Sequence, residues 1–235
     1  MPYLDPLPQD ERISIEAQLY AAQFDWPKAA EALGKLVTAR PQDPSVRLRL
    51  ISALLEGGRP DEAHAALNEL HKLPGMNDDA RLELAAAREA SARIDPKGRA
   101  EHATRALHLA LAHDNPGLAA QARQELGVAD YDLGQFDQAE TLHRDNIVYF
   151  QHAGDPPDEA YCHQALANAY SDHGNLAKAR EEYQRAIALY QQIGDLAGQA
   201  SRYDAISTML WGAGDAASAK VTVRRAIDLK RETTD

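Results

Sequence analysis

The amino-acid sequence predicts an all-α protein built from tandem pairs of antiparallel helices. Three observations support this class. Glycine returns at equal intervals from Gly134 to Gly214, alanine returns at intervals twice as long from Ala139 to Ala219, and no segment alternates apolar and polar residues as a strand does. A regular period of this kind points to repeats that stack on their neighbours along the chain.

Glycines in the second half of the chain are expected to end helices. They form a grid with equal spacing: Gly134, Gly154, Gly174, Gly194 and Gly214. Glycine adopts the left-handed conformation at a helix end without a steric penalty. Asp155, Asn175 and Asp195 follow three of these glycines and are good N-caps for the next helix. Each 20-residue unit therefore predicts one helix of about 16 residues, roughly 25 Å long.

Alternate helices resemble each other, so the repeat is a helix pair that spans two of these units. The loops GQFDQA, GNLAKA and GDAASA end in equivalent alanines: Ala139, Ala179 and Ala219. Small residues also return on the preceding helices: Gly127, Ala167 and Ser207. Because side-chain size sets the distance between packed helices, these positions predict a close approach within each pair.

The period is shorter near the N-terminus. Ala29 and Ala63 mark a 34-residue period, and Pro27 and Pro60 are suited to the first turn of the second helix of each pair. Residues 78–113 supply an irregular pair that lacks the glycine. Arg99 stands at its small position, so we expect the two helices of this pair to splay or to shift by one residue.

Six helix pairs follow from these signals. Their expected ranges are 11–38, 44–72, 78–113, 116–152, 156–192 and 196–232. We expect one solenoid over residues 1–235, with two 34-residue-type repeats at 11–72, the irregular repeat at 78–113 and three 40-residue-period repeats at 116–232.

The order of residue types within the pairs resembles the tetratricopeptide (TPR) repeat. The pattern is clearest at Leu166, Ala167, Tyr170, Gly174, Ala179, Tyr183 and Ala186. The second half is similar to the 40-residue variety of leucine-glycine-asparagine adaptors and of maltose-activator-type regulators. The resemblance covers nearly the whole chain and implies a right-handed α-solenoid of about six TPR-like antiparallel helix pairs.

The resemblance also implies a place for a ligand. In this family the first helix of each pair lines a concave groove, and nine positions of the last three repeats match that face: Gln124, Val128, Tyr131, Gln164, Asn168, Ser171, Asp204, Thr208 and Trp211. Asn168 matches the asparagine that commonly binds a peptide backbone, and its amide offers both a donor and an acceptor. For Tyr131 and Trp211 the alternative is a structural role, Trp211 covering the last repeat.

Two further sequence features concern charged ligands. Arg81 and Arg88 are seven residues apart and would either meet an acidic ligand or form a solvated pair. TPR domains that bind chaperone carboxylates use a lysine and an asparagine four residues apart on a groove helix. No equivalent pair in this sequence has that combination, which argues against a carboxylate clamp.

The sequence contains no recognisable catalytic, cofactor or metal motif. HExxH, paired Cys/His spacings, GxGxxG, GxxxxGK[ST] and GxSxG are all absent. Cys162 and His163 are adjacent in sequence and so point to different helix faces, which does not make a nucleophile–base pair. We therefore expect a protein that is not an enzyme and has no cofactor.

Charge and composition indicate which partners and which compartment to expect. Acidic residues outnumber basic ones by 36 to 25, and the basic cluster Arg224, Arg225, Lys230 and Arg231 is the only one, which disfavours nucleic acid. No apolar run approaches the roughly 18 residues that span a bilayer. No signal peptide is visible, and Cys162 is the single cysteine. These features suggest a cytoplasmic protein, or a periplasmic one if the chain is a fragment.

Three functions are compatible with these features. The first is a non-catalytic scaffold that binds a peptide or protein segment in its groove. The second is the sensing or partner-recruiting region of a larger bacterial regulator, a transcription activator or a kinase. The third is self-association through the last helix, where Val221, Val223 and Ile227 would leave an apolar face uncovered.

Overall fold

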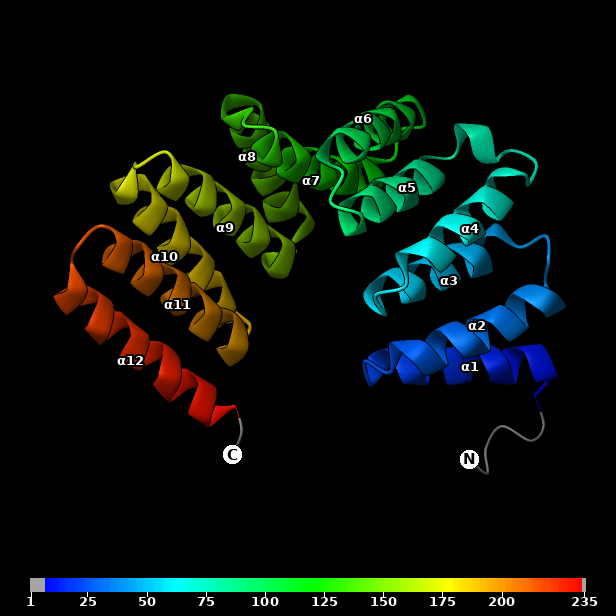
Figure 1. Ribbon diagram of the computed structural model, residues 1–235, viewed down its shortest axis with the longest axis horizontal. Coiled ribbons are helices and arrows are strands. Elements are labelled where there is room, and N and C mark those ends of the chain that lie inside the picture. Colours follow the sequence, from blue (N-terminus) through cyan, green and yellow to red (C-terminus); the bar gives the residue numbers. More distant parts are fainter. Residues whose placement is uncertain (1–6, 234–235) are drawn as a thin grey trace. The chain divides into compact units, whose positions relative to one another are not determined.

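Twelve α-helices and one short 3₁₀ turn follow one another in residues 7–233, the part of the chain that the computed structural model describes (Figure 1). These residues contain no β-strand. Consecutive helices pack as antiparallel pairs, which confirms the predicted fold class. None of the helices described is both long and apolar enough to cross a membrane.

The chain forms two compact units, Met1–Ala129 and Asp130–Asp235. The helices of the first unit are α1 (Gln9–Ala22), α2 (Trp26–Ala39), α3 (Pro44–Glu56), α4 (Pro60–His71), α5 (Ala80–Ala92) and α6 (Pro96–Ala112), with the 3₁₀ turn η1 (Met76–Asp78) before α5. Its core includes Leu33, Ile51, Leu54, Leu67 and Leu70. The helix α7 (Pro116–Asp132) begins in this unit and ends in the second.

The second unit contains the regular repeats. Its helices are α8 (Phe136–Ala153), α9 (Pro156–Asp172), α10 (Leu176–Gln192), α11 (Leu196–Gly212) and α12 (Ala216–Glu232). Leu166, Tyr170, Tyr183, Ile187 and Ile206 form its core. The predicted helix pairs agree with these bounds to within a few residues.

The glycine grid ends helices as predicted. All five glycines from Gly134 to Gly214 have φ between 68° and 82°, in the left-handed region. Asp155, Asn175 and Asp195 cap the following helices by accepting a backbone N–H. Three turns that lack a glycine use other residues in the same conformation: Phe24, Ile94 and Asp114. Such residues are strained there, because their Cβ approaches the backbone.

Small residues allow the close approach within pairs. Ala29, Ala63 and Ala179 are completely buried. Between α11 and α12, the Ser207 hydroxyl donates a hydrogen bond of 3.0 Å to the carbonyl of Ala219. The two predicted small positions of this pair therefore touch.

The irregular repeat keeps its register. Asp95 caps α6 by accepting from the N–H of Gly98, as Asn175 caps α10, and Arg99 is four residues after its cap, as Ala179 is. The expected shift by one residue does not occur. Instead the long side chain of Arg99 pairs with Glu125 of α7, 2.7 Å from Nη2 to Oε2.

Candidate peptide-binding groove

A pocket of about 590 Å³ opens on the second unit where α9, α10 and α11 meet the end of α7. Twelve residues line it: Tyr131, Asn168, Ser171, Asp172, Gly174, Leu176, Tyr183, Ala205, Thr208, Met209, Gly212 and Ala213. Four of the nine predicted groove residues are among them, namely Tyr131, Asn168, Ser171 and Thr208. Its wall is mainly apolar, with a few polar groups, as in many ligand sites.

Asn168 is oriented by its neighbour on α10. The Tyr183 hydroxyl donates a hydrogen bond of 2.6 Å to Oδ1 of Asn168. This contact fixes the side-chain amide with Nδ2 as its remaining donor. Burial raises the pKa of Tyr183, so its hydroxyl stays protonated and continues to donate.

Aromatic side chains form the edge of the pocket at the α7 end. The hydroxyl of Tyr131 donates to the carboxylate of Asp172. Its ring meets Phe136 edge to face, with centroids 5.6 Å apart, and Phe136 packs in the same manner on His173. Tyr131 therefore lines the pocket and also fixes the turn beside it.

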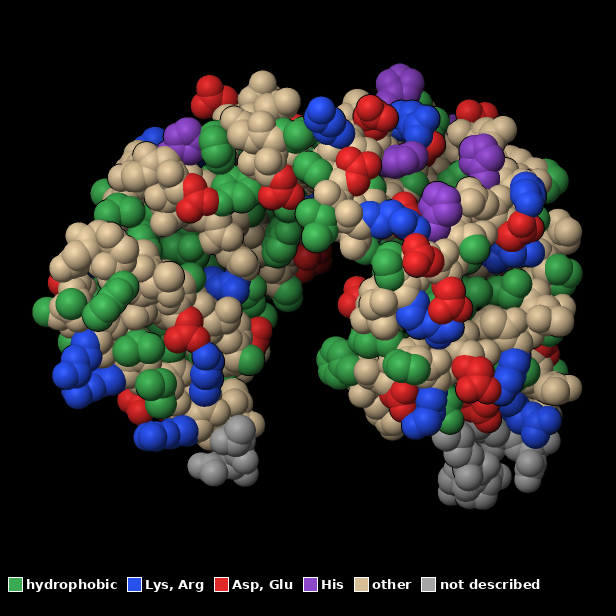
Figure 2. All heavy atoms as spheres, viewed as in Figure 1, with side chains coloured by type: hydrophobic (Ala, Val, Ile, Leu, Met, Phe, Trp, Pro, Cys, Tyr) green, Lys and Arg blue, Asp and Glu red, His purple; other side chains and the backbone are tan. Residues whose placement is uncertain are grey.

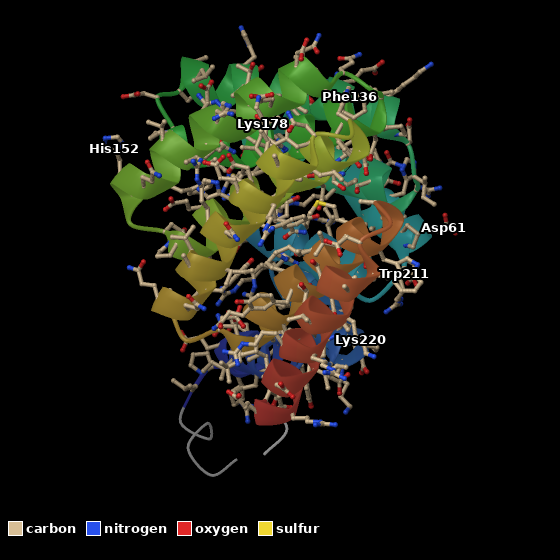
Figure 3. All side chains as sticks on the ribbon, turned by 90° about the vertical axis from the view of Figure 1, so that its left-hand side faces the viewer. Asp61, Phe136, His152, Lys178, Trp211 and Lys220 are labelled. Carbon is tan, nitrogen blue, oxygen red and sulfur yellow. The ribbon has the colours of Figure 1, made fainter. Side chains whose placement is uncertain are left out.

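The remaining predicted residues are not brought into this pocket. Oε1 of Gln164 accepts a hydrogen bond from Arg202, and the carboxylate of Asp204 pairs with Lys230 of α12. Trp211 is 70% exposed at the end of α11, so it does not cover the last repeat (Figure 3). Gln124 and Val128 are half-buried on the part of α7 that belongs to the first unit.

Sequence reasoning missed the residues of the pocket that do not lie on the selected helix face. Leu176 and Tyr183 come from the second helix of a pair. Ala205 and Gly212 lie three residues before and four residues after Thr208, so helical spacing from that residue would have found them. The contribution of α10 has no such signal, since it depends on how closely two helices pack.

A buried histidine–glutamate pair joins the two helices of the fifth repeat. Nδ1 of His163 is 2.6 Å from Oε2 of Glu182, and both side chains are only 6% exposed. Burial alone would raise the pKa of Glu182, but the hydrogen bond and charge of His163, with Arg185, lower it below its ordinary value. The third repeat has a similar pair, with 2.7 Å between His102 and Glu83.

Histidine side chains of the first unit come mainly from α4 and α6, and several are visible on one face of this unit (Figure 2). Within residues 7–233, however, no three histidine, cysteine, aspartate or glutamate side chains are arranged to bind a metal ion.

Cys162 is expected to be unreactive in the folded protein. It is fully buried on α9, and burial together with the charges of Asp158 and Glu159 raises the pKa of its thiol to about 12. Because the thiolate is the reactive form, we expect a disulfide reagent such as DTNB to modify the native protein at least about 100-fold more slowly than the urea-unfolded chain. Equal rates in the two states would show that this part of α9 opens readily.

Helix pairs packed in tandem define the class of this protein: it is a helical repeat protein. Tetratricopeptide repeat models match residues 20–73 in the first unit and residues 160–193 in the second. These matches support the TPR repeat for both units, and this fold is typically non-catalytic. None of the curated proteins compared with the chain matches it.

Solved structures show the same fold at low sequence identity. BtubC (BKLC) from P. vanneervenii has a TM-score of 0.70 and 18% identity, covering 96% of this chain and 91% of that one. The apo form of RapI has a TM-score of 0.72 and 9% identity, covering 97% and 99%. A putative kinesin light chain from Podosopora anserina with TPR-like repeats has a TM-score of 0.65 and 15% identity, covering 82% and 98%. At such identities the likeness concerns the fold alone.

Proposed function

We propose that the protein is a non-catalytic scaffold whose second unit binds an extended segment of a partner protein in the pocket around Asn168. The main support is the Tyr183–Asn168 hydrogen bond, which orients a polar group before any ligand arrives. Preorganisation of this kind favours binding, because the side chain loses little freedom on association. Nδ2 of Asn168 would donate to a backbone carbonyl of the segment.

The charge of the pocket limits which charges the bound segment can carry. Asp172 is the one charged residue among those that line the pocket. A carboxylate placed there would face it at low separation and be repelled. We infer that the bound stretch is neutral or basic, with small or apolar side chains against Leu176 and Met209.

Two other functions use different features. The chain as the sensing region of a larger regulator would use the same pocket and differ only in what is attached to it. Self-association would instead use α12, on which Val221 is 69% and Ile227 is 43% exposed. Light scattering at several concentrations separates this case, since a constant monomer mass excludes it.

The test is a comparison of partner capture by matched variants. Asn168→Asp retains an acceptor for Tyr183 but removes the Nδ2 donor, whereas Gln184→Glu makes the same chemical change on an exposed part of α10. We expect Asn168→Asp to weaken binding of a captured partner at least about tenfold, the loss of about 1.4 kcal/mol expected for one hydrogen bond, and Gln184→Glu to leave it unchanged.

Circular dichroism and thermal unfolding would show that both variants are folded. Equal binding by wild type and Asn168→Asp would contradict the proposal and indicate that the partner binds another face of the protein. A partner captured equally by all three proteins would not occupy this pocket.

A further inference from the structure

A second pocket, of about 240 Å³, lies in the first unit between α3, α5 and α7. Its lining residues are Leu48, Ile51, Ser52, Leu55, Arg81, Leu84, Ala85, Arg88, Leu118 and Gln121. Most are apolar, the only charged ones are two arginines, and no carboxylate is present. The chemistry of this pocket is therefore opposite to that of the pocket around Asn168, where the one charge is negative.

The two arginines are held in place by carboxylates beside them. Nε and Nη2 of Arg81 bind Asp79, while Nε of Arg88 binds Oε1 of Glu125 at 3.2 Å and its Nη2 contacts Gln121 at 3.4 Å. Asp79 and Glu125 are only 16% and 14% exposed, whereas the two arginine side chains are 46% and 47% exposed. Each guanidinium is fixed on one side and faces solvent on the other.

Free donors remain on both arginines. Within residues 7–233, Nη1 of Arg81 and Nη1 of Arg88 have no hydrogen-bond acceptor. Glu125 is shared with Arg99, so the group of Arg88, Arg99 and Glu125 has one positive charge in excess. A carboxylate would find an oriented donor at either arginine, and near Arg88 a favourable local charge.

The size of the pocket indicates what enters it. Sites for whole small molecules usually measure about 300–1,000 Å³, which is larger than this pocket. A space of about 240 Å³ with aliphatic walls suits one large apolar side chain, the kind of buried anchor that dominates binding in protein interfaces.

We propose that this pocket docks an acidic segment of a partner protein. One large apolar side chain of the segment, such as tryptophan, phenylalanine or leucine, inserts between Leu48, Leu84 and Leu118. Aspartate or glutamate carboxylates on either side of it bind the free donors of Arg81 and Arg88. The first unit thus selects acidic segments, in contrast to the second unit, and this inference does not depend on the proposed function of the pocket around Asn168.

The test is a titration of the full chain with synthetic probes. The probe is a fluorescein-labelled Gly/Ser peptide containing Glu-Trp-Asp, and its matched peptides contain Gln-Trp-Asn and Glu-Ala-Asp in the same frame. We expect the acidic tryptophan probe to bind at least about tenfold more tightly than either matched peptide, with an affinity that falls as salt is added. Fluorescence anisotropy reports each affinity.

Variants of the protein show whether the acidic tryptophan probe binds in this pocket. We expect Arg81→Gln/Arg88→Gln to reduce the affinity at least about tenfold, to the level of the Gln-Trp-Asn peptide. Ser52→Trp fills the pocket from an exposed position of α3 without changing a charge, and should abolish binding of the probe. Arg59→Gln is the matched control, because Arg59 pairs with Glu62 outside the pocket.

Three outcomes would overturn the proposal: no binding of the acidic tryptophan probe at about 1 mM protein, equal affinity for the acidic and amide peptides, or unchanged affinity in the arginine double variant. Asn168→Asp should leave the affinity for this probe unchanged. A loss in that variant would place the probe in the second unit and also overturn the proposal.

Discussion

Replacing His163 with glutamate will destabilise the protein by about 3–5 kcal/mol, because it leaves a buried charge without its partner. The imidazole of His163 is 2.6 Å from the carboxylate of Glu182, and Glu159 lies 3.7 Å from its other nitrogen. A glutamate at this position would place three carboxylates together, two of them almost completely buried. Urea unfolding followed by circular dichroism measures the loss.

The third repeat indicates a second substitution that should restore the stability lost in His163→Glu. Glu83 of the third repeat is equivalent to His163 of the fifth, two 40-residue periods further along the chain, and His102 is equivalent to Glu182 in the same way. The third repeat therefore has the same pair with the two residue types exchanged. Arg105 and Arg185 are related by the same interval, and each contacts the glutamate of its pair at 3.1 Å. The fold therefore accepts either arrangement of histidine and glutamate between the two helices.

We expect the double exchange His163→Glu/Glu182→His to recover most of the stability that His163→Glu loses. Its coupling energy in a double-mutant cycle should exceed the roughly 0.2–1 kcal/mol that is usual for exposed pairs. Losses that simply add would mean that the two side chains do not interact in solution. His152→Glu, on an exposed position of α8, is the control for the introduced charge.

Repeat spacing predicted the fold because it fixes both the helix ends and the contacts within pairs. The spacing of Gly134 to Gly214 predicted the turns, and the equivalent alanines predicted the close approach of helices. The turn at Ile94 was not predicted as left-handed, since this residue is strained in that conformation and no local signal requires it. Arg99 was expected to splay its pair or shift it by one residue; the shift is absent, and its long side chain pairs with Glu125 of α7.

The candidate site was only partly accessible from sequence. One helix face selected Asn168 and Thr208, which both line the pocket, because that choice needs only the helical period. The hydrogen bond from Tyr183 could not be predicted, since it depends on the distance between α9 and α10. The exchanged His–Glu pairs, in contrast, follow from the register of the repeats and could be found from sequence alone.

Buried His143 gives the second large expected effect, a loss of stability in mild acid. It is 2% exposed on α8, and among the residues described its Nδ1 has no hydrogen-bond partner. Burial lowers its pKa from 6.5 to about 4. The unfolded chain therefore binds a proton here at a higher pH than the folded protein, so the free energy of unfolding decreases as the pH falls from about 7.5 to 4.

The expected size of this effect is about 3 kcal/mol at pH 4, since each unit of pKa difference corresponds to about 1.4 kcal/mol. His143→Leu should remove it, and Leu33 and Leu67 already occupy the equivalent, buried position of the first two repeats. Carboxylates such as Glu182, whose pKa is lowered in the fold, also lose stabilising interactions in acid. The measurement is therefore the difference in unfolding free energy between wild type and His143→Leu at each pH.

This difference should change by about 3 kcal/mol in favour of the variant between pH 7.5 and pH 4. His71→Gln, which alters an exposed histidine, should give a curve parallel to that of wild type. If the His143→Leu curve were parallel as well, the imidazole would be able to accept a proton in the folded protein, and the packing of α8 around it would have to open at little cost. Because the other repeats place aliphatic or aromatic side chains at this position, a buried neutral histidine here makes the stability of this chain depend on pH in a way that those repeats do not.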